Sequence, residues 1–343
     1  MAIWFDESRL DDEATLDAFG PGLRALAENG ARVRRESHDA AQATAEAIAR
    51  DRISSRPRAV IAAGPGSRLL RAVLEPRCPV PFVAWPSPAL PGWTGSLDLV
   101  VMLAPEGSDL ASASAVAEAV RRGAQVVVAC PPDSIVAEHA AGRYTTILPT
   151  VTGDQLATAV VMLDYLDQVG LGPSADAESV ATALDAVALS CSPHRDLAVN
   201  PAKMLAIALA DTTPIVWGGS VLAARAARRV AESLRRSSGR SALAADADHL
   251  LPLIEASRER NVFEDPFAEG TAERRPLLIV LDDGAEDPAI REQRGRLQAA
   301  AATRGVRAET VTTDATTEVA RYASLMLQGL YAAEYLRVGL VDE

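Results

Sequence analysis

Short apolar runs that alternate with amphipathic segments constrain this chain more than any other feature. Four such runs lie in the first half of the chain, and four more follow Pro214. They cover residues 59–63, 80–85, 97–103, 125–130, 215–217, 241–245, 276–281 and 307–312. Runs that are apolar on both faces and joined by helices are typical of buried strands in a parallel sheet. The sequence therefore predicts an α/β fold with two parallel sheets flanked by helices.

The length of 343 residues fits two such domains. Helices are expected at 12–28 and 40–49. Between 152 and 209 the strand-like runs stop, and three helices rich in alanine and leucine are expected, with breaks at 170–173 and 192–193. The pattern predicts three ranges: N-terminal helices with a first three-layer domain (1–151), a helical connector (152–209), and a second three-layer domain (210–343).

Both halves contain a strand, a glycine turn, a serine and then an arginine-rich helix. The two turns are Gly64-Pro65-Gly66-Ser67 and Gly218-Gly219-Ser220, with their serines 153 residues apart. Such a turn offers backbone N–H groups and the positive end of a helix dipole to an anion. Alternatively, the serines only cap the helices that follow. A dinucleotide-binding motif is excluded because Leu69 stands in place of its third glycine.

The charge balance argues against several classes of partner. The chain has 34 Lys and Arg against 46 Asp and Glu, a net charge of −12, and only 4% aromatic residues. Nucleic acid is therefore not expected, since neither excess positive charge nor many stacking rings are present. The same acidity and the lack of an apolar run of about 20 residues argue against a membrane. The first ten residues lack the regions of a signal peptide, so we expect a cytoplasmic protein.

The cysteines give no sign of a disulfide framework or a metal site. Cys78, Cys130 and Cys191 lie far apart, without the spacing of metal ligands. We expect them to behave as small buried hydrophobic residues, and we expect no metal and no cofactor.

Several segments resemble a known family. Residues 200–209 begin Asn-Pro-Ala-Lys with the only lysine, Lys203; residues 121–124 read Arg-Arg-Gly-Ala; and a C-terminal helix is expected over 322–336. With the two α/β halves and the connector, these segments resemble the bifunctional phosphoglucose/phosphomannose isomerases of the sugar isomerase (SIS) family, most closely its divergent TobH-like branch. The resemblance covers about residues 58–336. It implies SIS-type domains, a homodimer and a sugar-phosphate ligand.

The resemblance also implies a reaction, the interconversion of glucose or mannose 6-phosphate with fructose 6-phosphate through a cis-enediol. The glutamate base of the family is best matched by Glu232, although Glu232 with Arg236 is equally a solvated helix pair. His249, 17 residues further on, matches a family histidine that a second subunit contributes. Alternatively, it is a helix-start histidine between Asp246 and Asp248. The substrate-binding residues implied are Gly64, Gly66, Ser67, Ser108, Ser112, Gly218, Gly219 and Ser220.

The expected phosphate loop departs from the family pattern. Residues 104–112 read Ala-Pro-Glu-Gly-Ser-Asp-Leu-Ala-Ser, so Glu106 and Asp109 stand where the family has hydroxyls. Ionised carboxylates repel a phosphate and cannot donate to it. They either exclude phosphate or hold a cation instead, or Ser108 and Asp109 simply cap the next helix.

Two family cations are also missing from their expected positions. Thr150 follows Pro149 where the family has arginine, and the C-terminal segment has no lysine. Arg143 is a candidate replacement for the arginine. His38, His139 and His194 are expected at the surface.

Two main functions remain open on the sequence alone. An isomerase with a remodelled site is favoured by the survival of Glu232 and His249. A non-catalytic SIS protein, which binds a sugar or sugar phosphate as a sensor or partner subunit, is favoured by the lost hydroxyls and cations. A scaffold with a vestigial cleft is the third possibility. In each case, a ligand is expected at the carboxyl ends of the strands, between the domains.

Overall fold

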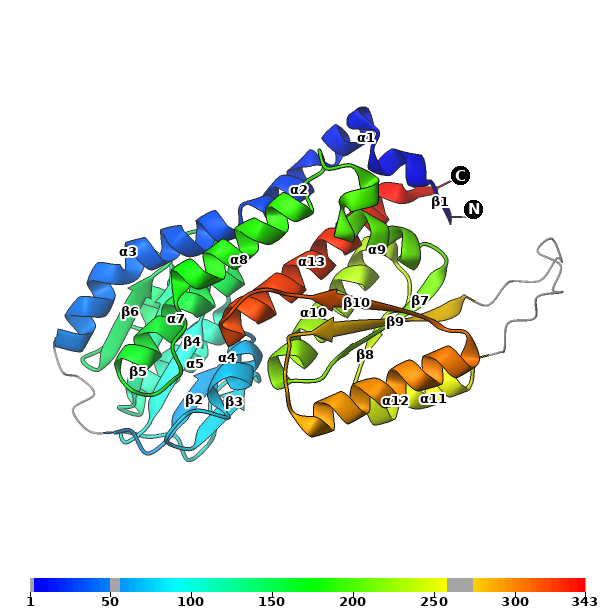
Figure 1. Cartoon of the computed structure of the whole chain (residues 1–343). Helices are drawn as coiled ribbons and strands as arrows, with labels where there is room; N and C mark the ends of the chain where they lie inside the picture. Colours follow the sequence, from blue (N-terminus) through cyan, green and yellow to red (C-terminus); the bar gives the residue numbers. More distant parts are fainter. Residues whose placement is uncertain (1–2, 50–55, 258–273, 343) are drawn as a thin grey trace, which may run out of the picture. The chain divides into compact units, whose positions relative to one another are not determined.

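The computed structural model describes residues 3–49, 56–257 and 274–342, and it is an α/β protein with two parallel sheets (Figure 1). The chain forms two compact units. The first unit is Asn29–Thr182, and the second unit combines Met1–Glu28 with Ala183–Glu343. Contacts thus group the N-terminal residues with the second unit, and they divide the connector inside helix α8 (Ala177–Ser190).

The first unit contains a five-stranded parallel sheet in the order β3-β2-β4-β5-β6. Its strands are β2 (Val60–Ala63), β3 (Phe82–Trp85), β4 (Leu99–Leu103), β5 (Gln125–Cys130) and β6 (Thr145–Pro149). Ala63 pairs with both Trp85 and Met102, so the carboxyl ends of β2, β3 and β4 lie side by side. The four predicted strands of this half are confirmed.

Helices cover both faces of this sheet. They are α3 (Asn29–Ala49), α4 (Ser67–Leu74), α5 (Leu110–Arg121), α6 (Ile135–His139) and α7 (Gln155–Gln168). Alternate strand residues such as Ile61, Val100 and Val128 pack against α5 and α6 in one apolar core. Helices α3, α4 and α7 lie against the opposite face. For α4 this follows from the right-handed crossover rule, because β2–α4–β3 runs across the sheet in the opposite direction to β4–α5–β5. The crossover from β3 to β4 contains no helix among these elements.

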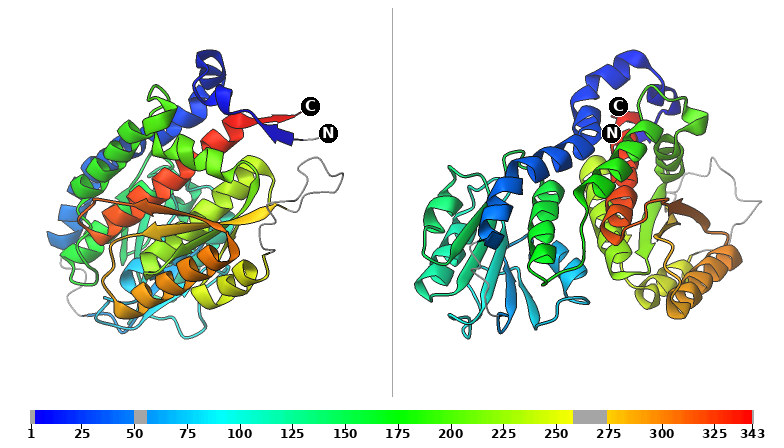
Figure 2. Two further views of the ribbon diagram at one scale, coloured as in Figure 1. Left: turned by 45° about the vertical axis from the view of Figure 1, so that its right-hand side comes forward. Right: turned by 60° about the vertical axis from the view of Figure 1, so that its left-hand side comes forward.

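The second unit contains a four-stranded parallel sheet in the order β10-β9-β7-β8. Its strands are β7 (Thr212–Gly218), β8 (Leu243–Ala244), β9 (Arg275–Asp282) and β10 (Arg307–Thr312). Its main helices are α9 (Pro201–Leu209), α10 (Val221–Ser238), α11 (Ala247–Glu255), α12 (Pro288–Arg304) and α13 (Glu318–Gly339). Helices α11 and α12 share a core with Ile215, Trp217 and Val280, whereas α10, α13 and α9 pack together on the other face (Figures 1 and 2).

The two ends of the chain meet within the second unit. Strand β1 (Ile3–Phe5) pairs antiparallel with β11 (Leu340–Asp342). Short helices follow β1: η1 (Glu7–Leu10), α1 (Glu13–Ala18) and α2 (Gly20–Ala27). The predicted helix over 12–28 is therefore broken at Phe19, where Gly20-Pro21-Gly22 follows, because glycine disfavours a helix interior and proline fits a first turn. A further turn, η2 (Leu197–Val199), precedes α9.

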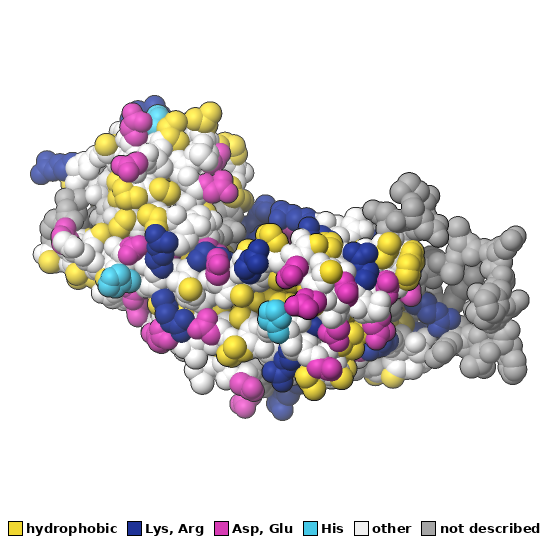
Figure 3. Space-filling model, turned by 90° about the horizontal axis from the view of Figure 1, so that it is seen from above, with side chains coloured by type: hydrophobic (Ala, Val, Ile, Leu, Met, Phe, Trp, Pro, Cys, Tyr) yellow, Lys and Arg dark blue, Asp and Glu magenta, His cyan; other side chains and the backbone are white. Residues whose placement is uncertain are grey.

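On the face drawn in Figure 3, the basic and acidic side chains are interspersed, and no continuous basic area is seen there. Among the described helices, none is long and apolar enough to span a membrane. The described residues also hold no cluster of three or more His, Cys, Asp or Glu that fits a metal ion.

Candidate anion-binding turn

The first glycine turn lies between β2 and α4 and has the features of an anion site. Gly64 adopts φ +79°, which favours glycine, and a Cβ on Gly66 would lie 2.8 Å from the Cβ of Leu103. Ser67 begins α4 and is 0% exposed, and its Oγ has no hydrogen-bond partner in the described part of the chain. Gly66, the N-cap residue, supplies no side-chain acceptor. The positive end of α4 is therefore free of an internal carboxylate cap.

The turn after β4 is closed by its own carboxylate. Asp109 is the N-cap of α5, where its Oδ2 accepts the N–H of Ser112 at 2.9 Å and its hydroxyl at 2.5 Å. These hydrogen bonds lower the pKa of Asp109, the hydroxyl of Ser112 being the larger cause. Ser108 and Glu106 are exposed. Ser112 thus donates to Asp109, and the capping alternative describes this turn.

The loop after β6 is closed by a carboxylate from a distant helix. Glu36 of α3 is 0% exposed, and both of its oxygens accept the N–H of Val151 at 2.9 Å. The N–H and hydroxyl of Thr152 also donate to Glu36, each at 2.5 Å. Thr150, which stands at the expected arginine position, precedes Val151 and is buried. Arg143 precedes the amino end of β6 and lies over the Tyr144 ring, whereas Thr150 follows the carboxyl end of the same strand. Arg143 therefore does not replace the family arginine.

The serine of the second glycine turn already has hydrogen-bond partners. The Oγ of Ser220 accepts the N–H of Ala223 at 3.0 Å and donates to Asp283 in the loop after β9. A Cβ on Gly218 would lie 2.3 Å from backbone atoms of Ala223, and one on Gly219 would lie 2.3 Å from Ile290. These glycines permit close packing, and Ser220 caps α10.

Glu232 and His249 lie on helices that cover opposite faces of the second sheet. Glu232, on α10, is held by two arginines of the same helix: Arg229 donates to its Oε2 at 2.9 Å and Arg236 to its Oε1 at 2.6 Å. His249 is exposed near the start of α11. The connections β7–α10–β8 and β8–α11–β9 run in opposite directions across the sheet, which places the two helices on opposite faces. The second unit of one chain does not bring the pair together. His38, His139 and His194 are exposed, as expected.

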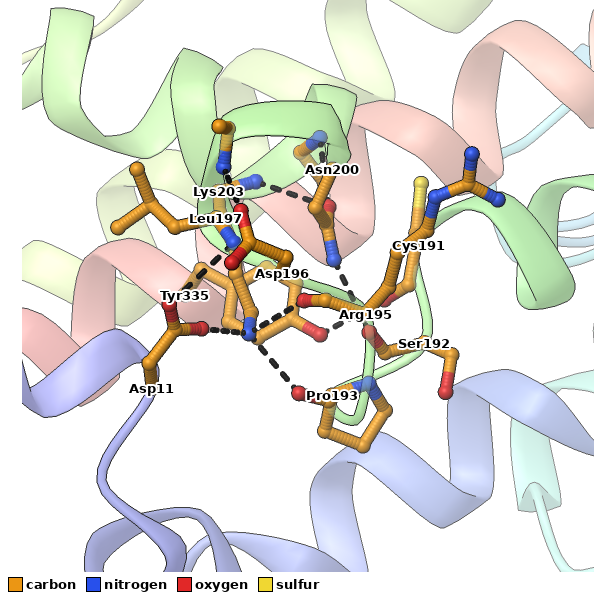
Figure 4. A network of polar contacts seen from close by, with 12 residues as sticks. Asp11, Cys191, Ser192, Pro193, Arg195, Asp196, Leu197, Asn200, Lys203 and Tyr335 are labelled. Atoms are coloured by element: carbon orange, nitrogen blue, oxygen red, sulfur yellow. Dashed lines mark hydrogen bonds and ion pairs between the residues drawn. The ribbon is translucent and has the colours of Figure 1, made fainter.

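Lys203 forms a buried polar network that the sequence did not reveal (Figure 4). Its side chain is 0% exposed, and Nζ donates to Asp11 Oδ1 at 2.6 Å, the Pro193 carbonyl at 2.8 Å and the Arg195 carbonyl at 2.9 Å. The ammonium also lies 5.6 Å from the ring centroid of Tyr335. All three N–H donors are used, so Lys203 holds the chain in place and is not free to act as an acid.

Neighbouring groups extend this network around the 191–200 turn. Asn200 caps α9 through its Oδ1 and donates from Nδ2 to the Ser192 carbonyl at 3.0 Å. The Tyr335 hydroxyl donates to the Cys191 carbonyl at 2.7 Å, and burial raises the pKa of Tyr335. Burial also raises the pKa of the Cys191 thiol to about 11. The Asn-Pro-Ala-Lys segment therefore stabilises the second unit.

The fold and the turns define a class of protein: two α/β units, each with a parallel sheet, and a glycine turn with a buried, unpartnered serine hydroxyl at the carboxyl end of the first sheet. Residues 198–339 match the family model described as the bacterial phospho-glucose isomerase C-terminal SIS domain. That match contains the Asn-Pro-Ala-Lys segment and α13. It relates residues 198–339 to that SIS domain.

Solved structures agree with the fold. Tagatose-6-phosphate ketose/aldose isomerase from Escherichia coli is 12% identical with a TM-score of 0.67, covering 93% of each chain. The C-terminal domain of glucosamine-fructose-6-phosphate aminotransferase from Francisella tularensis is 11% identical with a TM-score of 0.61, covering 93% of this chain and 96% of that one. A glucose-6-phosphate isomerase like protein from Thermus thermophilus is 16% identical with a TM-score of 0.54, covering 96% and 92%. No curated protein matches.

Proposed function

We propose that this chain binds a sugar phosphate and holds its phosphate at the N-terminus of α4. The observation that carries the proposal is the Ser67 hydroxyl, which is fully buried and lacks a partner among the described residues. Arg68 in the same first turn is exposed. A cation at the positive end of a helix is unfavourable unless an anion lies nearby. A bound phosphate would satisfy both the hydroxyl and this charge.

The other turns support the choice of this one. At each of the other turns a carboxylate already accepts hydrogen bonds. Asp109 does so at the start of α5, Glu36 in the loop after β6, and Asp283 at the start of α10. A phosphate at any of these positions would have to displace or oppose a carboxylate. The turn at Ser67 has no such competitor in its cap.

An active aldose–ketose isomerase is the second candidate. It is favoured by the family match over 198–339, which spans Glu232 and His249. In that case Glu232 would move the proton between C1 and C2, and His249 would come from a second subunit. Against this, both oxygens of Glu232 are already engaged by Arg229 and Arg236. We therefore favour a sugar-phosphate-binding protein of the phosphoglucose/phosphomannose isomerase type; the TobH-like branch, the homodimer and the cytoplasmic location remain predictions.

Calorimetric titration with fructose 6-phosphate, glucose 6-phosphate and mannose 6-phosphate tests the binding site. Ser67→Ala should weaken binding about 10- to 100-fold, since hydrogen bonds to charged groups contribute about 1.5–3 kcal/mol. Without ligand, Ser67→Ala should be at least as stable as the wild type, because the lost hydroxyl has no partner. Ser220→Ala is the matched control: it should lose about 1 kcal/mol of stability and keep its affinity. Equal affinity of wild type and Ser67→Ala would refute the site.

A coupled assay separates the two candidates. Conversion of fructose 6-phosphate to glucose 6-phosphate, and of mannose 6-phosphate to fructose 6-phosphate, is measured for the wild type and Glu232→Gln. Turnover that this substitution abolishes establishes the isomerase. Binding without turnover above background establishes the non-catalytic protein.

A further inference from the structure

Trp85, at the carboxyl end of β3, has a polar group with no assigned purpose. Its indole Nε1 is shielded from solvent and has no hydrogen-bond partner within the described residues. The ring is partly buried against the core beneath α5 and α6. A buried indole N–H usually donates to an acceptor. If Trp85 only filled the core, its N–H would be expected to donate to another protein group or to water. The missing acceptor is therefore the feature to explain.

Trp85 lies beside the proposed phosphate turn. The Gly64 N–H donates to the Trp85 carbonyl at 3.0 Å, and the Ser67 N–H donates to the Gly64 carbonyl at 3.1 Å. Two backbone hydrogen bonds thus connect the residue that carries the unpaired indole with the residue that carries the unpaired hydroxyl. Helix α4 also packs against β3. The two donors without partners thus lie on neighbouring segments at the carboxyl end of the sheet, with Ser67 on the helix that covers one face and Trp85 packed toward the other face.

Gly64 links these donors through its backbone and carries no side chain. A Cβ at Gly64 would lie 3.4 Å from the Ser112 Oγ and 3.8 Å from the Met102 Cε, so a side chain here would fill the space between the turn and α5. Trp85 shares the α5 side of the sheet with Ala63, its register partner. A ligand held at Ser67 would extend across Gly64 to reach it.

We propose that Trp85 recognises the sugar of the bound sugar phosphate, with its indole N–H donating to a hydroxyl or ring oxygen of the ligand. This inference rests on the proposed phosphate site at Ser67. It assigns the two donors different tasks: Ser67 binds the phosphate common to all such ligands, and Trp85 distinguishes a phosphorylated sugar from phosphate alone.

The experiment measures binding of inorganic phosphate, fructose 6-phosphate and glucose 6-phosphate by calorimetry to the wild-type protein, Trp85→Phe and Trp93→Phe. Phenylalanine keeps an aromatic ring against the core but removes the donor. Trp93, exposed in the loop after β3, is the matched control, and thermal unfolding verifies that each variant is folded.

Trp85→Phe should weaken binding of at least one sugar phosphate about 3- to 10-fold, the range for a neutral hydrogen bond, and leave inorganic phosphate within about two-fold. Trp93→Phe should change neither. Equal effects of Trp85→Phe on phosphate and sugar phosphates, or no effect on either, would overturn the role of Trp85 while leaving the Ser67 site intact. Failure of the wild type to bind any of the three would overturn the phosphate site, and this inference with it.

Discussion

Replacing Lys203 by methionine removes the ammonium group but keeps most of the side-chain volume. In the native protein, Nζ donates to Asp11 and to the carbonyls of Pro193 and Arg195. Methionine offers no donor, so the two carbonyls lose a partner inside the second unit. The apolar stem still packs, which isolates the polar contribution.

The magnitude follows from what is left unpaired. The hydrogen bonds to the Pro193 and Arg195 carbonyls are only partly buried, so each carbonyl left without a donor costs about 1 kcal/mol, the low end of the range for an unsatisfied group. The Asp11 side chain is 46% exposed and regains water, so its ion pair contributes about 1 kcal/mol at most. We therefore expect Lys203→Met to lower the free energy of unfolding by about 2–3 kcal/mol.

Urea unfolding measures this loss, with tryptophan fluorescence, to which the buried Trp217 of the second unit contributes, as one probe and circular dichroism as another. Asp11→Asn is the control, because it removes the negative charge but keeps an acceptor; it should cost about 1 kcal/mol or less. A loss below about 1 kcal/mol for Lys203→Met, or equal losses for the two variants, would show that the network does not stabilise the fold as argued.

Three further predictions concern the capping carboxylates Glu36 and Asp109 and the Cys191 thiol. Glu36→Gln should lower the free energy of unfolding by about 2–4 kcal/mol, because the amide group would face N–H donors of Val151 and Thr152; a change under about 0.5 kcal/mol in denaturant titration would contradict this. Asp109→Ala should cost about 1 kcal/mol at pH 7. Hydrogen bonds lower the pKa of Asp109 in the folded state. The stability difference between wild type and Asp109→Ala should therefore be complete above the unfolded pKa of about 3.9 and disappear as the pH falls through the folded pKa. A stability difference that persists at pH 2 in thermal unfolding would refute this. The Cys191 thiol, with a pKa of about 11, is about 0.1% thiolate at pH 8, so iodoacetamide should modify it in urea but hardly in the native protein; equal rates by mass spectrometry would contradict its burial.

The strand pattern was readable because a parallel sheet buries both of its faces. Every predicted run in the described residues became a strand, and the connector contains the three expected α-helices, α7, α8 and α9, which are separated at the breaks 170–173 and 192–193. Strand β6 was not predicted, since its sequence Thr-Thr-Ile-Leu-Pro alternates in burial and contains few apolar residues. The pairing of β1 with β11 was also missed, because nothing local marks strands that meet from opposite ends of the chain.

The sequence by itself determined the α/β class and the position of the glycine turns, because a strand, a turn and a helix start are encoded by neighbouring residues. Only the tertiary structure decided which turn has no carboxylate bound to it. Glu36 closes the β6 loop from 115 residues away, and Asp283 meets Ser220 from 63 residues away. Lys203 meets Asp11 across 192 residues. A buried polar group is satisfied by whatever the fold brings within hydrogen-bond distance, and sequence spacing does not report that distance.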